Sequence, residues 1–127
     1  MRAAGTLCVG LAMLACVPLH AEEDFARFED PHLQYGRGIW LDHCATCHAF
    51  GVAGAPNPRR PGQWRARLEK PLGMLHAHAI EGFFGSDDAY MPPRGGNPDL
   101  SDPEVIAAVD YMAALARLYL YELEKQP

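Results

Sequence analysis

Residues 44–48 read Cys44-Ala45-Thr46-Cys47-His48, and this short stretch decides how the rest of the chain is interpreted. Two cysteines spaced in this way, with a histidine directly after the second, fit three kinds of chemistry. They could form a redox-active disulfide, contribute to a zinc site, or attach a haem covalently. The remainder of the sequence has to supply the second half of whichever site is present.

The N-terminal segment has the pattern of an export signal. Arg2 precedes an apolar run over residues 3–19, and small residues lead to Ala21. We expect a signal peptide over residues 1–21 and a single domain over residues 22–127. Two alternatives remain: a lipoprotein signal over residues 1–15, with Cys16 lipidated and tethered to a membrane, or an uncleaved anchor. In either export route the domain is predicted to be periplasmic.

The cysteine count separates the three readings of the motif. Of the four cysteines, Cys8 and Cys16 lie in the predicted signal, so zinc would lack a second cysteine pair. His76 and His78 are too close in sequence to share one helical face. Thiol–disulfide exchange motifs usually follow a strand, whereas the segment upstream of Cys44 has a helical pattern. Haem attachment is favoured, with both thiols bound to the porphyrin and His48 as the proximal iron ligand.

The pattern of apolar residues and turn residues predicts an all-α domain without strong strand signals. Helices are expected over residues 33–45, 63–69, 71–81 and 102–124. Gly36 on the first helix indicates a place where another backbone comes close. Ser101 and Glu104 form a capping-box pattern before the last helix. That helix is apolar on two sides, so we expect it to pack against another helix and against something else large and apolar.

A haem ligated on both faces needs a second axial residue, and Met91 is the best candidate. It lies in a predicted loop, directly before Pro92 and Pro93, which restrict the backbone. Met74 and Met112 are interpreted as core residues, and His76 and His78 as partly exposed helix residues. His32 and His43 lie just before the motif, where the chain geometry disfavours ligation on the opposite face of the haem. The sequence offers no obvious distal acid–base pair.

Three stretches together resemble the small class I c-type cytochromes of bacteria, most of all the cytochrome c5 group. They are GRGIWLDHCATCHAFGVAGAP (36–56), QWRAR (63–67) and MPPRGGNPDLSDPEVIAAVDYM (91–112). The resemblance implies the class I cytochrome c fold, in which the N- and C-terminal helices pack together around one covalently bound haem. It also implies that Gly36 and Trp40 face Tyr111 where those helices meet.

The same resemblance assigns roles to individual residues. It implies thioether bonds at Cys44 and Cys47, and axial ligation of the iron by His48 and Met91. Three further residues are implied to bind the haem or its ligands: Pro56, whose carbonyl would accept a hydrogen bond from the proximal imidazole, and Trp64 and Arg67, which would lie near the propionates. The chain departs from the group in a longer segment from Gly82 to Met91.

The function that follows is a periplasmic one-electron carrier, not an enzyme. The net charge of −5 argues against a nucleic-acid partner. Residues 57–70 are locally basic, either as a solvated face or as a surface that steers docking. Redox proteins would dock transiently, through Arg59, Arg60 and Arg94, and a membrane is involved only if Cys16 is lipidated. The alternatives are a cytochrome subunit of a larger complex, or a haem sensor or peroxidase with displaceable Met91.

Overall fold

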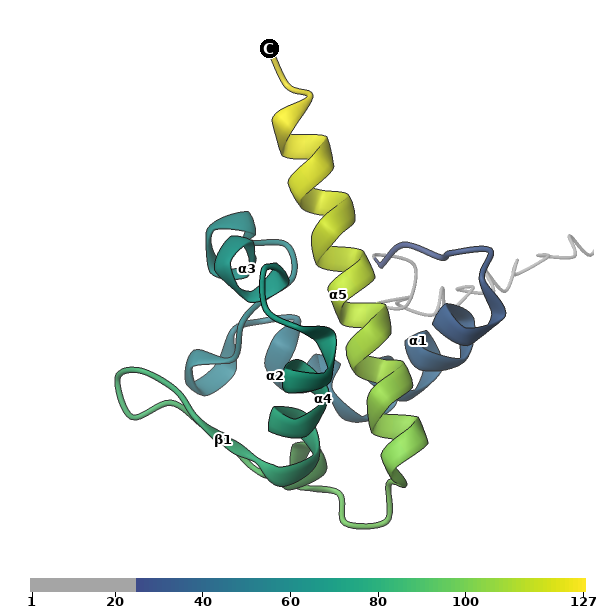
Figure 1. Cartoon of the computed structure of the whole chain (residues 1–127), viewed down its shortest axis with the longest axis vertical. Coiled ribbons are helices and arrows are strands. Elements are labelled where there is room, and N and C mark those ends of the chain that lie inside the picture. The colour runs from purple at the N-terminus through teal and green to yellow at the C-terminus, as the bar shows by residue number, and fades with distance from the viewer. Residues whose placement is uncertain (1–24) are drawn as a thin grey trace, which may run out of the picture.

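A computed structural model describes residues 25–127, so the predicted signal segment, with Cys8 and Cys16, lies outside the described residues. The chain runs in the order α1 (Pro31–His43), α2 (Ala45–His48), η2 (Val52–Gly54), α3 (Pro61–Leu68), α4 (Leu72–Glu81), β1 (Phe83–Phe84), β2 (Tyr90–Met91), η3 (Pro93–Gly96) and α5 (Asp102–Glu124). Helices dominate (Figure 1), which confirms the predicted all-α class. No helix within residues 25–127 is long and apolar enough to cross a membrane.

Helix α1 begins two residues earlier than the sequence predicts. The Asp30 carboxylate accepts hydrogen bonds from the backbone N–H groups of His32 (2.8 Å) and Leu33 (3.2 Å). Pro31 occupies the first turn, where its missing N–H costs nothing. The helix ends at His43, and Cys44 separates it from α2.

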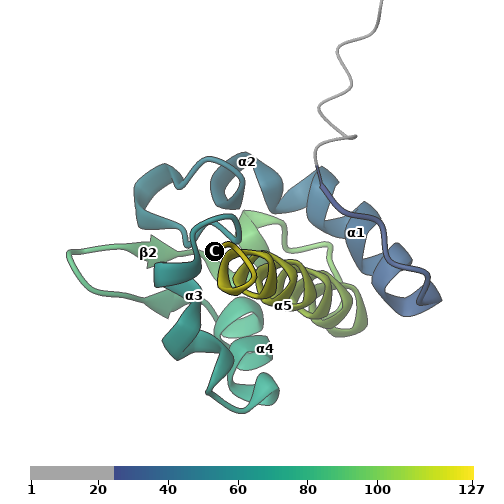
Figure 2. The same ribbon diagram turned by 90° about the horizontal axis from the view of Figure 1, so that it is seen from above.

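Helix α5 is the centre of the fold. It contacts α1 on one side and α3 and α4 on the other, and Figure 2 shows this arrangement nearly along its axis. At its start, the Glu104 carboxylate accepts a hydrogen bond from the Ser101 backbone N–H at 2.8 Å, as the capping-box prediction requires. The last turns of α5 extend beyond the other helices (Figure 1).

The predicted close approach of α1 and α5 is confirmed at Gly36. A Cβ atom at this position would lie 2.0 Å from the Ala107 carbonyl oxygen and 3.2 Å from the Tyr111 Cβ. Only a glycine lets the two backbones meet at this distance. The second glycine of α1, Gly38, has nothing within 4 Å of an added Cβ and serves no such contact.

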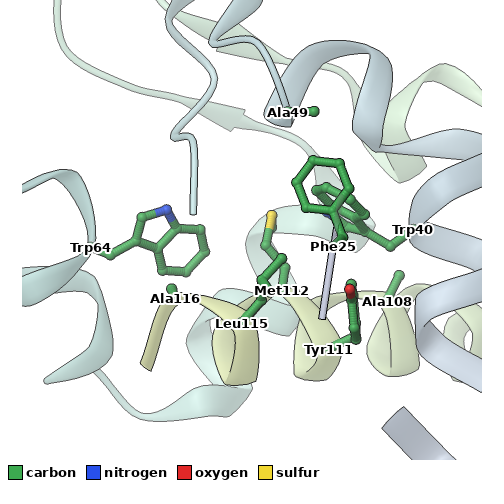
Figure 3. Close-up of a cluster of buried hydrophobic side chains, with 9 residues drawn as sticks. All are labelled: Phe25, Trp40, Ala49, Trp64, Ala108, Tyr111, Met112, Leu115 and Ala116. Carbon is green, nitrogen blue, oxygen red and sulfur yellow. The ribbon is translucent and has the colours of Figure 1, made fainter. Parts of the chain in front are cut away.

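The main core lies between these helices and is rich in aromatic side chains. Trp40 and Tyr111 are fully buried, with ring centroids 5.7 Å apart, and Phe25 packs on Trp40 at 4.8 Å. Figure 3 shows the cluster, to which α5 contributes most of the aliphatic side chains. The Tyr111 hydroxyl donates to the Ala26 carbonyl at 2.9 Å, which fixes the segment before α1.

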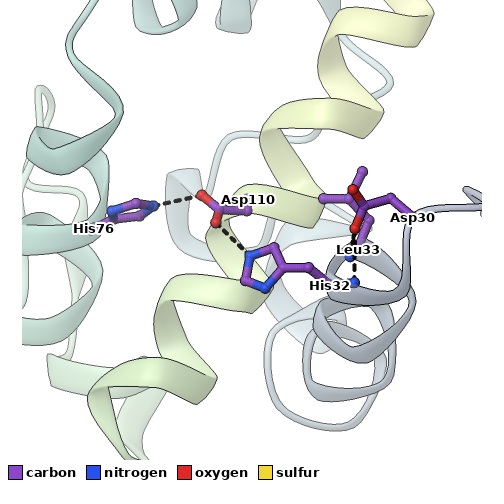
Figure 4. A network of polar contacts seen from close by, with 5 residues as sticks. All are labelled: Asp30, His32, Leu33, His76 and Asp110. Atoms are coloured by element: carbon purple, nitrogen blue, oxygen red, sulfur yellow. Dashed lines mark hydrogen bonds and ion pairs between the residues drawn. The ribbon is translucent and has the colours of Figure 1, made fainter.

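A polar bridge ties α1, α4 and α5 together. One Asp110 carboxylate oxygen lies 2.7 Å from His32 Nε2, and the other lies 2.6 Å from His76 Nε2 (Figure 4). The Asp110 and His76 side chains are largely buried, whereas His32 is half exposed. We call this group the His–Asp–His bridge. The bridge explains why an acidic residue, Asp110, lies between the two apolar faces of α5.

Residues 83–100 are not the continuous loop that the sequence predicts. β1 and β2 pair antiparallel, with Phe83 opposite Met91 and Phe84 opposite Tyr90. The hairpin projects from the body of the molecule (Figures 1 and 2). With two residues in each strand, it is too short to produce the alternating pattern by which strands are recognised in a sequence.

Candidate functional site

The motif at residues 44–48 forms a single helical turn that presents its two thiols differently. Cys44 is half-buried and Cys47 is exposed, and both thiols are free. Burial, followed by the neighbouring Cys47, raises the pKa of the Cys44 thiol to about 11. This thiol is therefore protonated near neutral pH, whereas disulfide exchange needs a thiolate. The environment of Cys44 does not favour the thiol–disulfide reading of the motif.

The side chain of His48 is buried and held in one orientation. Its Nδ1 lies 3.0 Å from the Pro56 carbonyl oxygen. A carbonyl can only accept, so Nδ1 carries the proton and the Nε2 lone pair remains available for a metal. Burial, with a further contribution from the Arg67 guanidinium, lowers the pKa of His48, while the hydrogen bond to Pro56 opposes this effect. The imidazole is neutral at neutral pH, as a metal ligand must be.

The loop that carries Pro56 is anchored by Asn57. Its side-chain amide donates to the Ala49 carbonyl at 2.8 Å, directly after the motif. Its backbone N–H donates to the Gln63 side chain at 2.8 Å. Asn57 therefore sets the distance between His48 and Pro56, a role that the sequence analysis missed. Its position in the segment Asn-Pro-Arg, where Asx turns are common, was the available signal.

Trp64 and Arg67 lie on neighbouring turns of α3. Trp64 is 2% exposed, and within the described residues its indole N–H has no hydrogen-bond partner. A buried donor without a partner is costly, and a carboxylate would satisfy it. The Arg67 guanidinium donates to the Gln63 carbonyl and contributes positive charge near His48. Such a pair suits an acidic group such as a haem propionate.

Met91 lies on β2, the second strand of the hairpin. Met91 is partly buried and packs against a small apolar cluster formed by α4, α5 and Leu100, which lies just before α5. A Cβ atom on Gly54, in the loop that follows the motif, would lie 2.9 Å from the Cβ of Ala89 in the hairpin. The structure thus brings the Met91 hairpin against the loop that carries the His48 partner, although 43 residues separate His48 from Met91.

The three arginines predicted to dock partners have different environments. The Arg59 guanidinium lies 4.0 Å from the Phe25 ring centroid. Arg94 donates to the Leu100 carbonyl at 2.8 Å and forms an ion pair with Asp102 at 2.6 Å. Arg94 therefore holds η3 to the start of α5. Arg60 is exposed at the start of α3.

Within residues 25–127, no group of three or more His, Cys, Asp or Glu side chains could hold a metal ion. The zinc reading of the motif therefore lacks a complete set of ligands in this part of the chain. The motif needs a partner group that supplies the remaining coordination itself.

Comparison with known proteins identifies that group. Residues 31–112 match the family model described as cytochrome c oxidase, cbb3-type, subunit III, which spans both the motif and Met91. The chain belongs to the c-type cytochromes. Cytochrome c-555 of Prosthecochloris aestuarii is 37% identical over 90 residues, which cover 68% of this chain and 91% of the relative. Cytochrome c5 of Ectopseudomonas mendocina is 36% identical, over 61% of this chain and 85% of the relative.

A solved structure agrees with this assignment. The chain superposes with a TM-score of 0.58 and 35% identity on a chain from an electron transfer complex of nitrite reductase with cytochrome c. The match covers 69% of this chain and 98% of the other. The resemblance to small class I cytochromes and the class I fold are both confirmed.

Membership in this family gives the cytochrome one covalently bound haem c with its iron, which undergoes one-electron oxidation and reduction. The chain offers what this group needs: two free thiols, a buried neutral imidazole, and a buried indole donor. The protein is a monohaem electron carrier.

Proposed function

We propose that this cytochrome carries single electrons in the periplasm with His48 and Met91 as axial ligands of its iron. Thioether bonds form at Cys44 and Cys47. The observation that carries the proposal is the His48–Pro56 hydrogen bond, which leaves Nε2 free as a ligand and fixes the ring. A thioether sulfur on the opposite face favours Fe(II) and raises the reduction potential.

The other residues of the site support electron transfer rather than a catalysed reaction. His48 keeps its proton on Nδ1 through both oxidation states, because Pro56 can only accept it. Trp64 and Arg67 supply donors and positive charge for the propionates. If His48 and Met91 both ligate the iron of the bound haem, the iron would have no open site for a substrate.

Replacing Met91 tests the ligation. Met91→Ala should keep covalent haem but lose the Met-to-ferric-iron charge-transfer band and lower the reduction potential. Met74→Leu is the matched control and should change neither property. The prediction that Met74 lies in the core is wrong, because its side chain is 44% exposed on α4. An unaltered band in Met91→Ala would show that another residue ligates the iron. A high-spin ferric spectrum of the unmodified protein would instead favour a sensor or peroxidase.

A haem-stained denaturing gel and the intact mass test attachment and export together. The purified protein should retain haem on the gel, and Cys44→Ser with Cys47→Ser should lose it. A mass that corresponds to residues 22–127 plus haem supports the signal cleavage and the periplasmic location. A mass that includes lipid on Cys16 would establish the tethered form, and the mass of the uncleaved chain would establish the anchored form.

Docking is proposed to involve Arg59, Arg60 and Arg94, with Arg60 the most accessible. Arg60→Glu should slow reduction by an anionic small-molecule reductant at low ionic strength, and the difference should fade as salt screens it. Lys70→Glu, the same charge change at an exposed site beyond the C-terminal end of α3, is the control. Equal slowing in both variants would point to net charge rather than to a docking surface.

A second candidate function is that of a subunit in a larger redox complex. The matched family model is described as an oxidase subunit, and α5 projects with Tyr121 55% and Leu123 48% exposed. Light scattering of the purified native protein, which reports its oligomeric state, separates the two functions. A monomer that exchanges electrons rapidly with soluble donors supports the carrier function. A stable assembly with other proteins supports the subunit function.

A further inference from the structure

The hairpin that carries Met91 is too small to hold its own shape. It has two residue pairs, and isolated two-stranded hairpins are at best marginally stable in water. Residues opposite each other in an antiparallel pair share a face. Phe83 and Met91 therefore lie on one face, and Phe84 and Tyr90 lie on the other. The position of the Met91 sulfur depends on what holds the first face.

On that face Met91 packs against the apolar cluster of α4 and α5, and Phe83 packs against His78 of α4. Its imidazole stacks on the Phe83 ring, with centroids 4.0 Å apart and an interplanar angle of 18°. The pair on the other face, Phe84 and Tyr90, forms its own contact at 4.5 Å. Phe84 is 76% exposed, so this second pair packs mainly on itself.

Helix α4 is a firm support for this stack. Ala79, the next residue, is buried in the apolar cluster that Met91 also contacts. Two residues before His78, His76 joins the His–Asp–His bridge to α5. Contacts of the residues before and after His78 therefore hold this part of α4 in place.

The base of the hairpin allows little independent movement. Gly82 joins α4 to β1 with φ +86, and a Cβ there would lie 3.1 Å from the Met91 carbonyl oxygen and 3.0 Å from Pro93. The path from α4 through Gly82 into Phe83 is thus tightly packed against the chain on either side of Met91.

We propose that His78 is a positioning residue for Met91 and acts through Phe83. The stacked imidazole holds the Phe83 strand, and the paired strand holds the Met91 sulfur at the iron. The inference rests on the proposed ligation by Met91. His78 contributes no ligand of its own and no charge that the effect requires.

Competition between Met91 and added imidazole for the ferric iron measures the effect. The loss of the Met-to-ferric-iron charge-transfer band during titration gives an equilibrium constant for displacement. An aromatic stack of this kind corresponds to a change of about two- to tenfold. His78→Ala should therefore raise the displacement constant by about two- to tenfold. His78→Phe, which can keep the stack without an ionisable group, should restore it.

Phe84→Ala is the matched control, because it removes an aromatic ring from the same strand but from the opposite face. It should leave the displacement constant unchanged. A His78→Ala constant equal to that of the unmodified protein, or a Phe84→Ala effect of the same size, would overturn the inference. Far-ultraviolet circular dichroism of each holoprotein shows whether the helices are intact.

The same variants separate this inference from the proposed function. If Met91→Ala keeps the charge-transfer band, the ligation proposal fails and the inference fails with it. If Met91→Ala loses the band and His78→Ala shifts nothing, only the inference fails. If His78 were itself the ligand, His78→Ala would abolish the native spectrum before any imidazole was added, and Met91→Ala would not.

Discussion

Replacing Gly36 by alanine tests the contact on which the packing of α1 and α5 depends. The added Cβ would lie 2.0 Å from the Ala107 carbonyl oxygen and 2.6 Å from its carbonyl carbon. Both are backbone atoms inside α5, so no side-chain rotation can relieve the overlap. The two helices must separate, which also loosens the packing of Tyr111 against Trp40.

The magnitude follows from two opposing effects. Alanine in place of glycine within a helix is intrinsically favourable by about 0.5–1 kcal/mol. Overpacking a well-filled core is unfavourable by about 1–3 kcal/mol, and a backbone overlap belongs at the upper end. Gly36→Ala should therefore lower the free energy of unfolding by about 2 kcal/mol.

Gly38→Ala is the matched control in the same helix. Nothing lies within 4 Å of a Cβ at this position, so only the helix propensity changes. This variant should be more stable than the unmodified protein by about 0.5–1 kcal/mol. Both substitutions add the same methyl group, and they differ only in the atoms that surround it.

Urea unfolding of the holoprotein, followed by far-ultraviolet circular dichroism, measures both variants against the unmodified protein. The difference between them should be about 3 kcal/mol, with similar slopes against urea. Equal stability of the two variants would refute the close crossing of α1 and α5. A Gly36→Ala protein more stable than Gly38→Ala would refute it more strongly.

Three further substitutions test other parts of the fold. Asp110→Ala leaves the two imidazoles of the His–Asp–His bridge without their acceptor and should lower the unfolding free energy by about 1–3 kcal/mol, measured by urea unfolding. Tyr111→Phe removes the donor to the Ala26 carbonyl and should lower it by about 1 kcal/mol in the same assay; an unchanged value in either variant would contradict its contact. Hydrogen bonds from the Ser101 side chain and backbone lower the pKa of Glu104. Its contribution to stability is therefore present above the unfolded-state pKa and lost as pH falls through the lowered value. The stability gap between Glu104→Gln and the unmodified protein should close on acidification, and a gap that persists in acid would contradict the cap.

The local features of the site were predictable from the sequence because neighbours in the chain create them. Cys44, Cys47 and His48 share one helical turn, so their relative placement needs no tertiary contact. The capping box of α5 is equally local. Gly36 was identified as a point of close approach because a helical glycine has a known cost, and because the family resemblance places it with Trp40 on the face opposite Tyr111.

Features that depend on distant partners could not be predicted. The hairpin was interpreted as a loop because its four residues carry no periodic signal and its register depends on packing against α4 and η3. The His–Asp–His bridge joins three helices, and no local pattern pairs His76 with Asp110. The ion pair between the Arg94 guanidinium and Asp102 is likewise a contact that only the folded chain creates.

The contacts that close this fold join the two ends of the described chain. The hydrogen bond between Tyr111 and Ala26 spans 85 residues, and the contact between His32 and Asp110 spans 78. Folding must therefore close long loops before these contacts form, which slows it relative to helical proteins whose neighbours in sequence pack together. During synthesis, α1 emerges well before the helix on which it packs. A growing chain leaves the Gly36 surface of α1 unpaired until α5 has been made, so this core closes only after the other described helices have been synthesised.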